Sequence, residues 1–362
     1  MSKVKHSYKV TNSQSENTYV QVKDRFYFDE NNQKISPLKL ADNESNNTYA
    51  KVDQLLVTSS PHTFSKTTTA KIMLDVIIAL LPATVLSVIF FGINALLIVL
   101  TCVVSSVLFE WIFQRICKKN TTINDLSAAV TGLLLALNLP AADFKDMWFP
   151  CVVGSLVAVV VVKGLFGGLG KNFANPAITA RVILLIAFST VGSAVHPIIA
   201  DVTTGATPLG VLGGSEGTLP SLLNMLLGIR GGALGETSVL ALLAGGVYLI
   251  CRRVITWHAP VGFIATVFVL SFLVKTDVNY ALYQMVSGGL FIGAFFMATD
   301  YVTTPSRPLG RLIFGIGCGL ITVAIRIWGT YPEGVSFSIL FMNLLTPYID
   351  RLTEKRPFGG IR

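Results

Sequence analysis

The residues of this chain that could do chemistry gather in one short stretch, ADVTTGATPLG, within a largely apolar sequence. It contains Asp201, Thr204, Gly205, Ala206 and Thr207. The stretch is small and rich in hydroxyl groups, which is unexpected in a chain composed mostly of apolar runs. The same residue types also form turns, and Asp201 could cap a helix. Residue types alone leave both interpretations open.

The elements that must position this stretch are predicted to be membrane helices. Of the 362 residues, 52% are hydrophobic and 13% are charged, whereas soluble domains carry about 25% charged residues. Runs such as LDVIIALLPATVLSVIFFG approach the roughly 20 residues that cross a bilayer core of about 30 Å. The composition therefore predicts an all-α polytopic membrane protein in contact with membrane lipid.

About ten spans are expected from the apolar runs, at residues 72–91, 94–113, 125–139, 148–166, 176–194, 236–251, 259–274, 281–299, 309–327 and 334–350. The third and eighth runs both contain a helix rich in small residues, and each of these helices ends at a polar break. The two runs are five spans apart. A repeated unit of five spans must insert in opposite orientations. We therefore expect two inverted five-helix repeats, 71–194 and 236–350.

The charges of the connecting segments predict the orientation. Alternate connections and the C-terminus carry thirteen Lys and Arg residues, and the intervening connections carry four. Because positive charge stays on the cytoplasmic side, both termini are expected there, with a cytoplasmic N-terminal extension, 1–70, and a cytoplasmic tail, 351–362. The loop 195–235 is expected outside. The same rule accounts for the net charge of +8, so no nucleic-acid partner is predicted.

The order of residues in the opening stretch resembles a flavinylation motif, an acidic residue followed after two positions by Ser/Thr-Gly-Ala-Thr. Asp201, Thr204, Gly205, Ala206 and Thr207 match it. In proteins with this motif, a flavin transferase on the outer face joins FMN through its phosphate to the last threonine. The resemblance implies a covalent FMN on Thr207, which serves as an anchor, and no residue is assigned a catalytic role.

Further segments are similar to the RnfD family, the D-type subunits of the Rnf complex: SPHTFSKTTTAKIMLDVIIALLPA, LSAAVTGLLLALNLP, KGLFGGLGKNFANPA and ATDYVTTPSRPLGRLIFGIG. The resemblance runs from about Val57 nearly to the C-terminus. The related B subunit of the sodium-pumping NADH:quinone reductase shares the fold and flavin motif, but its opening differs from Ser60-Pro61-His62. The family usually begins near this segment, so the fifty-odd residues before it are a departure without an assigned role.

The resemblance implies a membrane electron carrier, one redox subunit of a complex that couples electron transfer between ferredoxin and NAD to Na⁺ or H⁺ translocation. The implied partners are the G, A, E and C subunits and the flavin transferase. The implied location is the plasma (inner) membrane of a prokaryote. A solute channel or transporter is the rival interpretation, because inverted repeats with broken helices are typical of such proteins.

The family core can also hold a second, noncovalent flavin such as riboflavin between its halves. The candidate residues flank the two helix breaks: Lys171, Asn172, Asn175, Asp300, Thr303 and Thr304. A broken helix offers free backbone donors and a dipole end to a polar ligand. Alternatively, these side chains close the breaks by bonding to their own backbone.

Four ionisable residues lie near the ends of predicted spans: Asp75, Glu110, Arg181 and Arg326. We expect Glu110 and Arg326 to extend toward the membrane surface, whereas Asp75 and Arg181 could pair and serve an ion route. The five cysteines include no C-x-x-C pair, so no metal site is predicted. A cysteine donated to a cluster shared with a neighbouring subunit stays an alternative.

Overall fold

The computed structural model describes residues 68–354, apart from 120, 169, 189–190, 192–206, 216, 237 and 330–332, and four short strands before them. The chain divides into two compact units, Met1–Lys66 and Thr67–Arg362. In the first unit, β1 (His6–Asn12) pairs antiparallel with β2 (Ser15–Gln21), and β3 (Tyr27–Phe28) pairs with β4 (Lys34–Ile35).

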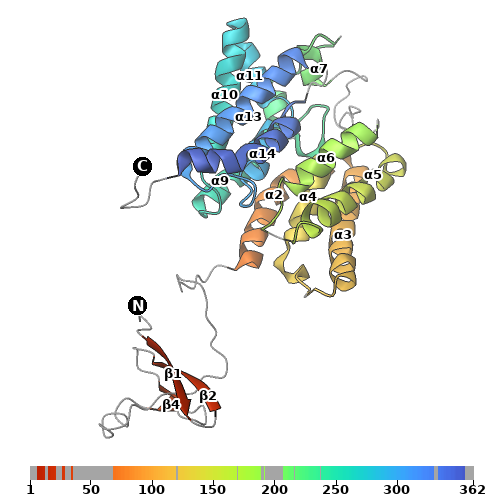
Figure 1. Cartoon of the computed structure of the whole chain (residues 1–362). Coiled ribbons are helices and arrows are strands. Elements are labelled where there is room, and N and C mark those ends of the chain that lie inside the picture. The colour runs from red at the N-terminus through yellow and green to blue at the C-terminus, as the bar shows by residue number, and fades with distance from the viewer. Residues whose placement is uncertain are drawn as a thin grey trace. The chain divides into compact units, whose positions relative to one another are not determined.

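The described part of the second unit is helical (Figure 1). Its elements are α2 (Thr69–Phe91), α3 (Ile93–Ile116), η1 (Ile123–Asp125), α4 (Ser127–Leu137), α5 (Phe144–Leu156), η2 (Val157–Gly164), α6 (Pro176–Ala187), α7 (Pro208–Leu212), α8 (Leu222–Leu227), η4 (Leu234–Glu236), α9 (Val239–Cys251), α10 (His258–Lys275), α11 (Val278–Val286), α12 (Leu290–Ile292), η5 (Gly293–Met297), α13 (Pro308–Trp328) and α14 (Val335–Thr353). Both η2 and η5 are π-helical.

Local signals account for several of the helix ends. The hydroxyl of Thr68 accepts a hydrogen bond from the Lys71 N–H at the start of α2, as capping side chains do. Gly92 has a φ of 72° and turns the chain directly from α2 into α3. Asn175 caps α6, and Pro176 occupies its first turn, where a missing N–H costs nothing. The chain therefore carries its own start and stop signals at these breaks.

Five helices are long and apolar enough to cross a membrane: α2, α3, the continuous α5–η2, α10 and α13. A sixth candidate is the pair formed by α11 and the α12–η5 segment, which is bent by 65° at its break. The helices α4, α6 and α9 are apolar but shorter, and a straight crossing needs about 20 residues. The second unit is therefore a multi-pass membrane protein with five or six such spans in its described residues.

The helices of the two sequence halves form two groups that meet along one interface (Figure 1). Across it, α2 packs against α9 and α6 packs against α14. Gly245 on α9 permits the first contact, because a Cβ there would lie 2.2 Å from the carbonyl oxygen of Ala79. Within the halves, α3 packs on α5 and α10 packs on α13. The core therefore continues from one half into the other.

Both halves contain a helix break close to this interface. After α4, the backbone extends, and Pro140 forms a β-bridge with Ala233, while the Leu234 N–H donates to the Leu139 carbonyl oxygen at 2.9 Å. Between α11 and α12 the chain turns at Ser287 and at Gly288, which has a φ of 66°. These breaks leave backbone carbonyls that need other donors.

Candidate functional site

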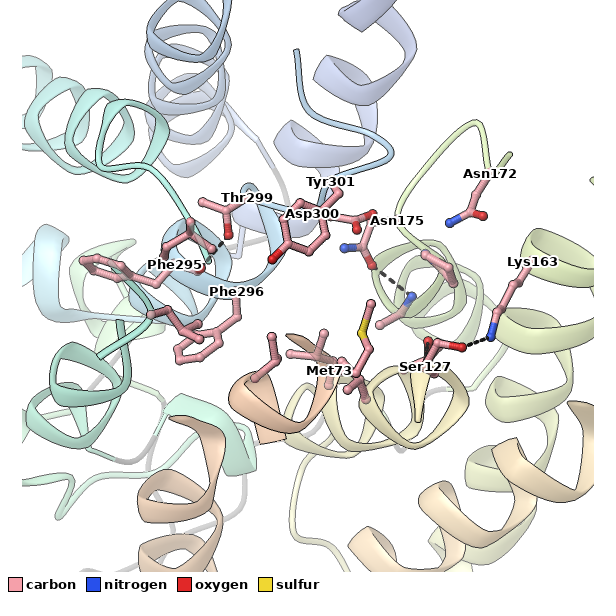
Figure 2. A pocket seen from close by; sticks show the side chains of 18 residues that line it. Met73, Ser127, Lys163, Asn172, Asn175, Phe295, Phe296, Thr299, Asp300 and Tyr301 are labelled. Atoms are coloured by element: carbon pink, nitrogen blue, oxygen red, sulfur yellow. Dashed lines mark hydrogen bonds between the residues drawn. The ribbon is translucent and has the colours of Figure 1, made fainter. Parts of the chain in front are cut away.

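A cavity of about 710 Å³ lies between the two halves, partly open to the outside. Figure 2 shows the side chains around it, which come from α2, α4, η2, the segment before α6, and η5 with the residues that follow. The cavity is lined mainly by apolar groups, with a few polar side chains between them.

Asn172 and Asn175 are polar side chains of the first half that line this cavity. The Asn175 side-chain oxygen accepts from the N–H groups of Ala177 and Ile178, and its amide donates to the Met297 carbonyl oxygen at 3.4 Å. Asn175 therefore caps α6 and ties it to the other half. The side-chain oxygen of Asn172 is buried and has no hydrogen-bond partner among the described residues, so it is available to a ligand donor.

Asp300 and Tyr301 are polar side chains of the second half that line the same cavity. Burial raises the pKa of the Asp300 carboxyl, although hydrogen bonds from Thr303 and from the backbone of Val302 and Tyr301 oppose the rise. Burial and the nearby carboxylates also raise the pKa of Tyr301 to about 12. Tyr301 therefore stays a neutral phenol at physiological pH.

Three of the six predicted second-flavin residues line the cavity: Asn172, Asn175 and Asp300. The other three have different surroundings. Lys171 is exposed and does not line this cavity. The Thr303 hydroxyl donates to Asp300 at 3.1 Å, and the Thr304 hydroxyl donates to the Ala298 carbonyl oxygen at 2.9 Å. Both threonines stabilise the segment after η5, but only Thr304 bonds to the backbone, as the backbone-closing alternative expects.

Several lining residues do not stand out in the sequence: Met73, Ser127, Lys163, Phe295, Phe296 and Tyr301. The charge pattern of the sequence assigns Lys163 to a cytoplasmic loop, but the residue is only 3% exposed in the structure. Its ammonium group lies 2.8 Å from Glu110 and donates to Ser127. The sequence could have indicated this role, because Lys163 lies at the end of the apolar run VAVVVVKG, and a buried cation there requires a partner.

The predicted anchor Thr207 caps α7, and its hydroxyl accepts from the Gly210 N–H at 3.1 Å. The motif residues Asp201, Thr204, Gly205 and Ala206 lie outside the described residues. A second cavity, of about 860 Å³, lies beside α7 and is lined by Gly210, Lys275, Tyr280, Gln284 and Arg326 among others. A group attached to Thr207 therefore has a polar, cationic cavity next to its anchor.

The expected pairing of Asp75 with Arg181 is wrong. Asp75 accepts from the Arg252 guanidinium at 3.2 Å and from the Tyr248 hydroxyl at 3.1 Å, because α9 packs on α2. Arg181 instead donates to the carbonyl oxygen of Asn138 and forms an ion pair with Glu333. Helix packing brings each residue a partner that its position in the sequence does not suggest.

The expectation that Glu110 and Arg326 extend to the membrane surface is also wrong. Glu110 is 5% exposed and Arg326 is 8% exposed. Glu110 pairs with Lys163, and Arg326 donates to the backbone carbonyls of Gln284 and Ser287. Buried charges persist where such partners replace water, and here the neighbouring helices supply them.

Residues 56–359 match the model of the NQR2, RnfD, RnfE family. A relative from Acetobacterium woodii, the D subunit of a Na(+)-translocating ferredoxin:NAD(+) oxidoreductase complex, is 48% identical over 309 residues, which cover 84% of this chain and 95% of the relative.

Two further relatives carry similar names. The D subunit of the proton-translocating ferredoxin:NAD(+) oxidoreductase complex of Clostridium ljungdahlii is 40% identical over 324 residues, covering 84% of this chain and 96% of the relative. The D subunit of the ion-translocating oxidoreductase complex of Stutzerimonas stutzeri is 39% identical over 330 residues, covering 80% and 92%. The similarity thus extends over nearly the whole length of each relative.

Proposed function

This chain belongs to the NQR2, RnfD, RnfE family, and from that premise we propose that it is the D-type subunit of an ion-translocating ferredoxin:NAD oxidoreductase complex. In that complex it is a membrane electron carrier with FMN attached to Thr207. The relatives named as subunits of such complexes support this role. The other Rnf subunits, with the G subunit as the exchange partner, and the flavin transferase are its proposed partners, and Na⁺ or H⁺ is the translocated ion.

The proposed architecture is ten spans in two inverted repeats of five, in the plasma membrane of a prokaryote. Two symmetric helix pairs support it, because α2 and α9 would be the first helices of each repeat, and α6 and α14 the last. Corresponding pairs inside the repeats, α3 with α5 and α10 with α13, also pack together. This arrangement keeps both termini cytoplasmic and the Thr207 loop outside.

The observation that carries the FMN proposal is the cationic cavity beside α7, next to the anchor. Lys275 and Arg326 line it, and the Arg326 Nε is buried without a partner among the described residues. A phosphate-linked flavin is anionic, so these donors fit it. When bound, FMN supplies the electron-transfer chemistry. Thr207 anchors the flavin, and Lys275 and Arg326 supply positive charge beside it.

We propose that the cavity between the halves holds a second, noncovalent flavin such as riboflavin. The Asn172 side-chain oxygen has no donor partner among the described residues, and an isoalloxazine ring presents an N–H group. Phe295 and Phe296 line the same cavity and can pack against a flat ring. In this role, Asn172 accepts a hydrogen bond, and Asn175 and Asp300 orient the polar edge of the ligand.

A solute channel is less well supported, because arginine side chains donate hydrogen bonds to the backbone carbonyl oxygens at both helix breaks. Arg181 donates to Asn138, Arg230 to Val286, and Arg326 to Gln284 and Ser287. In ion-coupled transporters, such freed carbonyls coordinate the cation. Guanidinium groups at these positions repel cations from the same place.

In-gel flavin fluorescence of the denatured full chain, made in a host with the transferase, tests the proposal. The wild type should give a fluorescent band, and Thr207→Ala a dark one. Thr207→Ser should retain fluorescence, because it keeps the alcohol. Ser221→Ala is the matched control, since Ser221 caps α8 in the same way, accepting from Asn224 at 3.3 Å. A dark wild-type band, or a fluorescent Thr207→Ala band, rejects the assignment.

A further inference from the structure

Five charged side chains from both halves form a group that we name the arginine–glutamate cluster: Arg181, Arg230, Arg326, Glu236 and Glu333. Arg181 lies on α6, Arg326 on α13 and Glu333 just before α14. The three arginines are between 4% and 8% exposed, and the Glu333 side chain is 20% exposed. The cluster is therefore largely removed from water.

The arginines of the cluster bind the ends of the broken helices. Arg181 donates to the Asn138 carbonyl oxygen after α4, and Arg230 to the Val286 carbonyl oxygen at the end of α11. The Arg326 guanidinium donates to the Ser287 carbonyl oxygen at 3.0 Å. These carbonyls form the negative ends of helix dipoles. The arginines are consequently held in place by backbone, and their charge is not committed to the carboxylates alone.

The two carboxyl groups of the cluster lie together. The Glu333 carboxylate disfavours a negative charge on Glu236, because two like charges at close range repel each other. A Cβ placed on Gly289, in the break before α12, would lie 3.3 Å from a Glu333 oxygen and 3.8 Å from a Glu236 oxygen. The two carboxylates thus meet at the same point of the helix break.

The surroundings of Glu236 favour its protonated form. Burial and the Glu333 carboxylate raise the pKa of Glu236 to about 8, and the charges of Arg181 and Arg230 oppose this rise. Arg326 also faces both carboxylates, and Tyr280 faces Arg326. Two interacting carboxyl groups titrate as one unit. Glu236 therefore changes its charge close to physiological pH.

The helix break connects this pair to the helix that follows Thr207. A Cβ placed on Gly288 would lie 2.5 Å from a Leu209 methyl carbon and 3.1 Å from the Arg326 guanidinium. Leu209 is the second residue after Thr207, and Gly288 directly precedes Gly289, whose built Cβ would lie near both carboxylates. Arg326 also lines the cavity beside α7, so it lies between the carboxyl pair and the proposed flavin.

We propose that Glu236 and Glu333 form a proton-binding site whose occupancy follows the redox state of the flavin carried by Thr207. This inference rests on the proposed function. When electrons from the neighbouring redox subunits reduce that flavin, negative charge increases near Arg326. The proton affinity of the pair then rises, and a pair that lacks its proton takes one from water: a water O–H bond breaks, leaving hydroxide, and an O–H bond forms on a carboxylate oxygen. The pair releases that proton after reoxidation. The coupling is electrostatic, and one unit charge within about 10 Å changes a proton affinity roughly tenfold at an effective dielectric constant of 20.

Redox-induced infrared difference spectroscopy tests this site on the full flavin-bearing chain in lipid nanodiscs. Dithionite reduction near pH 8 should produce a carbonyl-stretch signal of a protonated carboxylic acid in the wild type. The signal should be lost in Glu236→Gln and shifted in Glu236→Asp, which keeps a carboxyl group. Glu354→Gln, at an exposed position after α14, is the matched control and should retain the wild-type signal.

The pH dependence of the flavin midpoint potential gives the second readout. Its slope should change near the Glu236 pKa of about 8 in the wild type and in Glu354→Gln, and it should not change there in Glu236→Gln. A fluorescent Glu236→Gln chain with the wild-type infrared signal and slope overturns the coupling and leaves the carrier function intact. A wild-type chain without fluorescence rejects the flavin itself, and the coupling with it.

Discussion

The ammonium group of Lys163 lies 2.8 Å from a Glu110 carboxylate oxygen, and their side chains are only 4% and 6% exposed. Lys163 is on the π-helical η2, and Glu110 is on α3. The same ammonium donates to the hydroxyl of Ser127 at the start of α4. One lysine therefore joins three helices of the first half and reaches the cavity between the halves.

Removing one partner of this ion pair should destabilise the protein strongly. Lys163→Met leaves the Glu110 carboxylate buried and uncompensated, which costs about 3–5 kcal/mol. The double variant Glu110→Leu with Lys163→Met should recover most of that loss, because no charge remains buried. Thermal unfolding in detergent measures both, and equal destabilisation of the single and double variants would contradict the prediction.

Loss of the Asn172 amide should weaken the noncovalent flavin and leave the covalent one in place. Asn172→Ala removes the unpartnered buried acceptor of the cavity, and one such hydrogen bond accounts for roughly tenfold in affinity. Flavin released by acid denaturation reports the noncovalent site, whereas flavin on Thr207 stays with the chain. Asn94→Ala is the control, because Asn94 bonds Asp143 near the start of α3. Unchanged flavin release from Asn172→Ala would exclude this assignment.

The contact between α2 and α9 should be sensitive to a single methyl group. A Cβ on Gly245 would lie 2.2 Å from the Ala79 carbonyl oxygen and 3.1 Å from the Phe296 ring. Gly245→Ala should therefore destabilise the interface between the halves by about 1–3 kcal/mol. Val247→Ala on the same helix, where the side chain is 53% exposed, should change the melting temperature little. Equal effects of the two variants would indicate that the close approach is unimportant.

The stability of the protein should fall as the pH rises toward 8. The pKa of Glu236 is about 8 in the folded protein, against an ordinary value of 4.5. Between these values the folded state holds a proton that the unfolded state has released, so raising the pH favours unfolding. The melting temperature should decrease over this window in the wild type and vary less in Glu236→Gln. Glu354→Gln should behave as the wild type does, and a wild-type slope in Glu236→Gln would contradict the prediction.

The membrane class was predictable from the sequence because it depends on local signals, and the anchor stays a prediction that depends on a local motif. Long apolar runs specify helices such as α2 and α13 wherever they pack, since each helix satisfies its own backbone in lipid. Residues Asp201 to Thr207 form a contiguous motif, and a motif of this kind needs no knowledge of distant contacts. The helix break before α6 was also visible, because Asn175 and Pro176 are local start signals.

Tertiary structure alone decided which charges meet. Asp75 bonds Arg252 across 177 residues, and Arg181 bonds Glu333 across 152. It also decided that Asn172 and Asp300 share a cavity while Lys171 does not. Such contacts depend on how helices pack and how each is rotated about its axis, and small changes in either redirect a side chain. The physical reason is that a residue's own neighbours in the chain determine its helix, whereas the desolvated partner of a buried charge comes from a different helix.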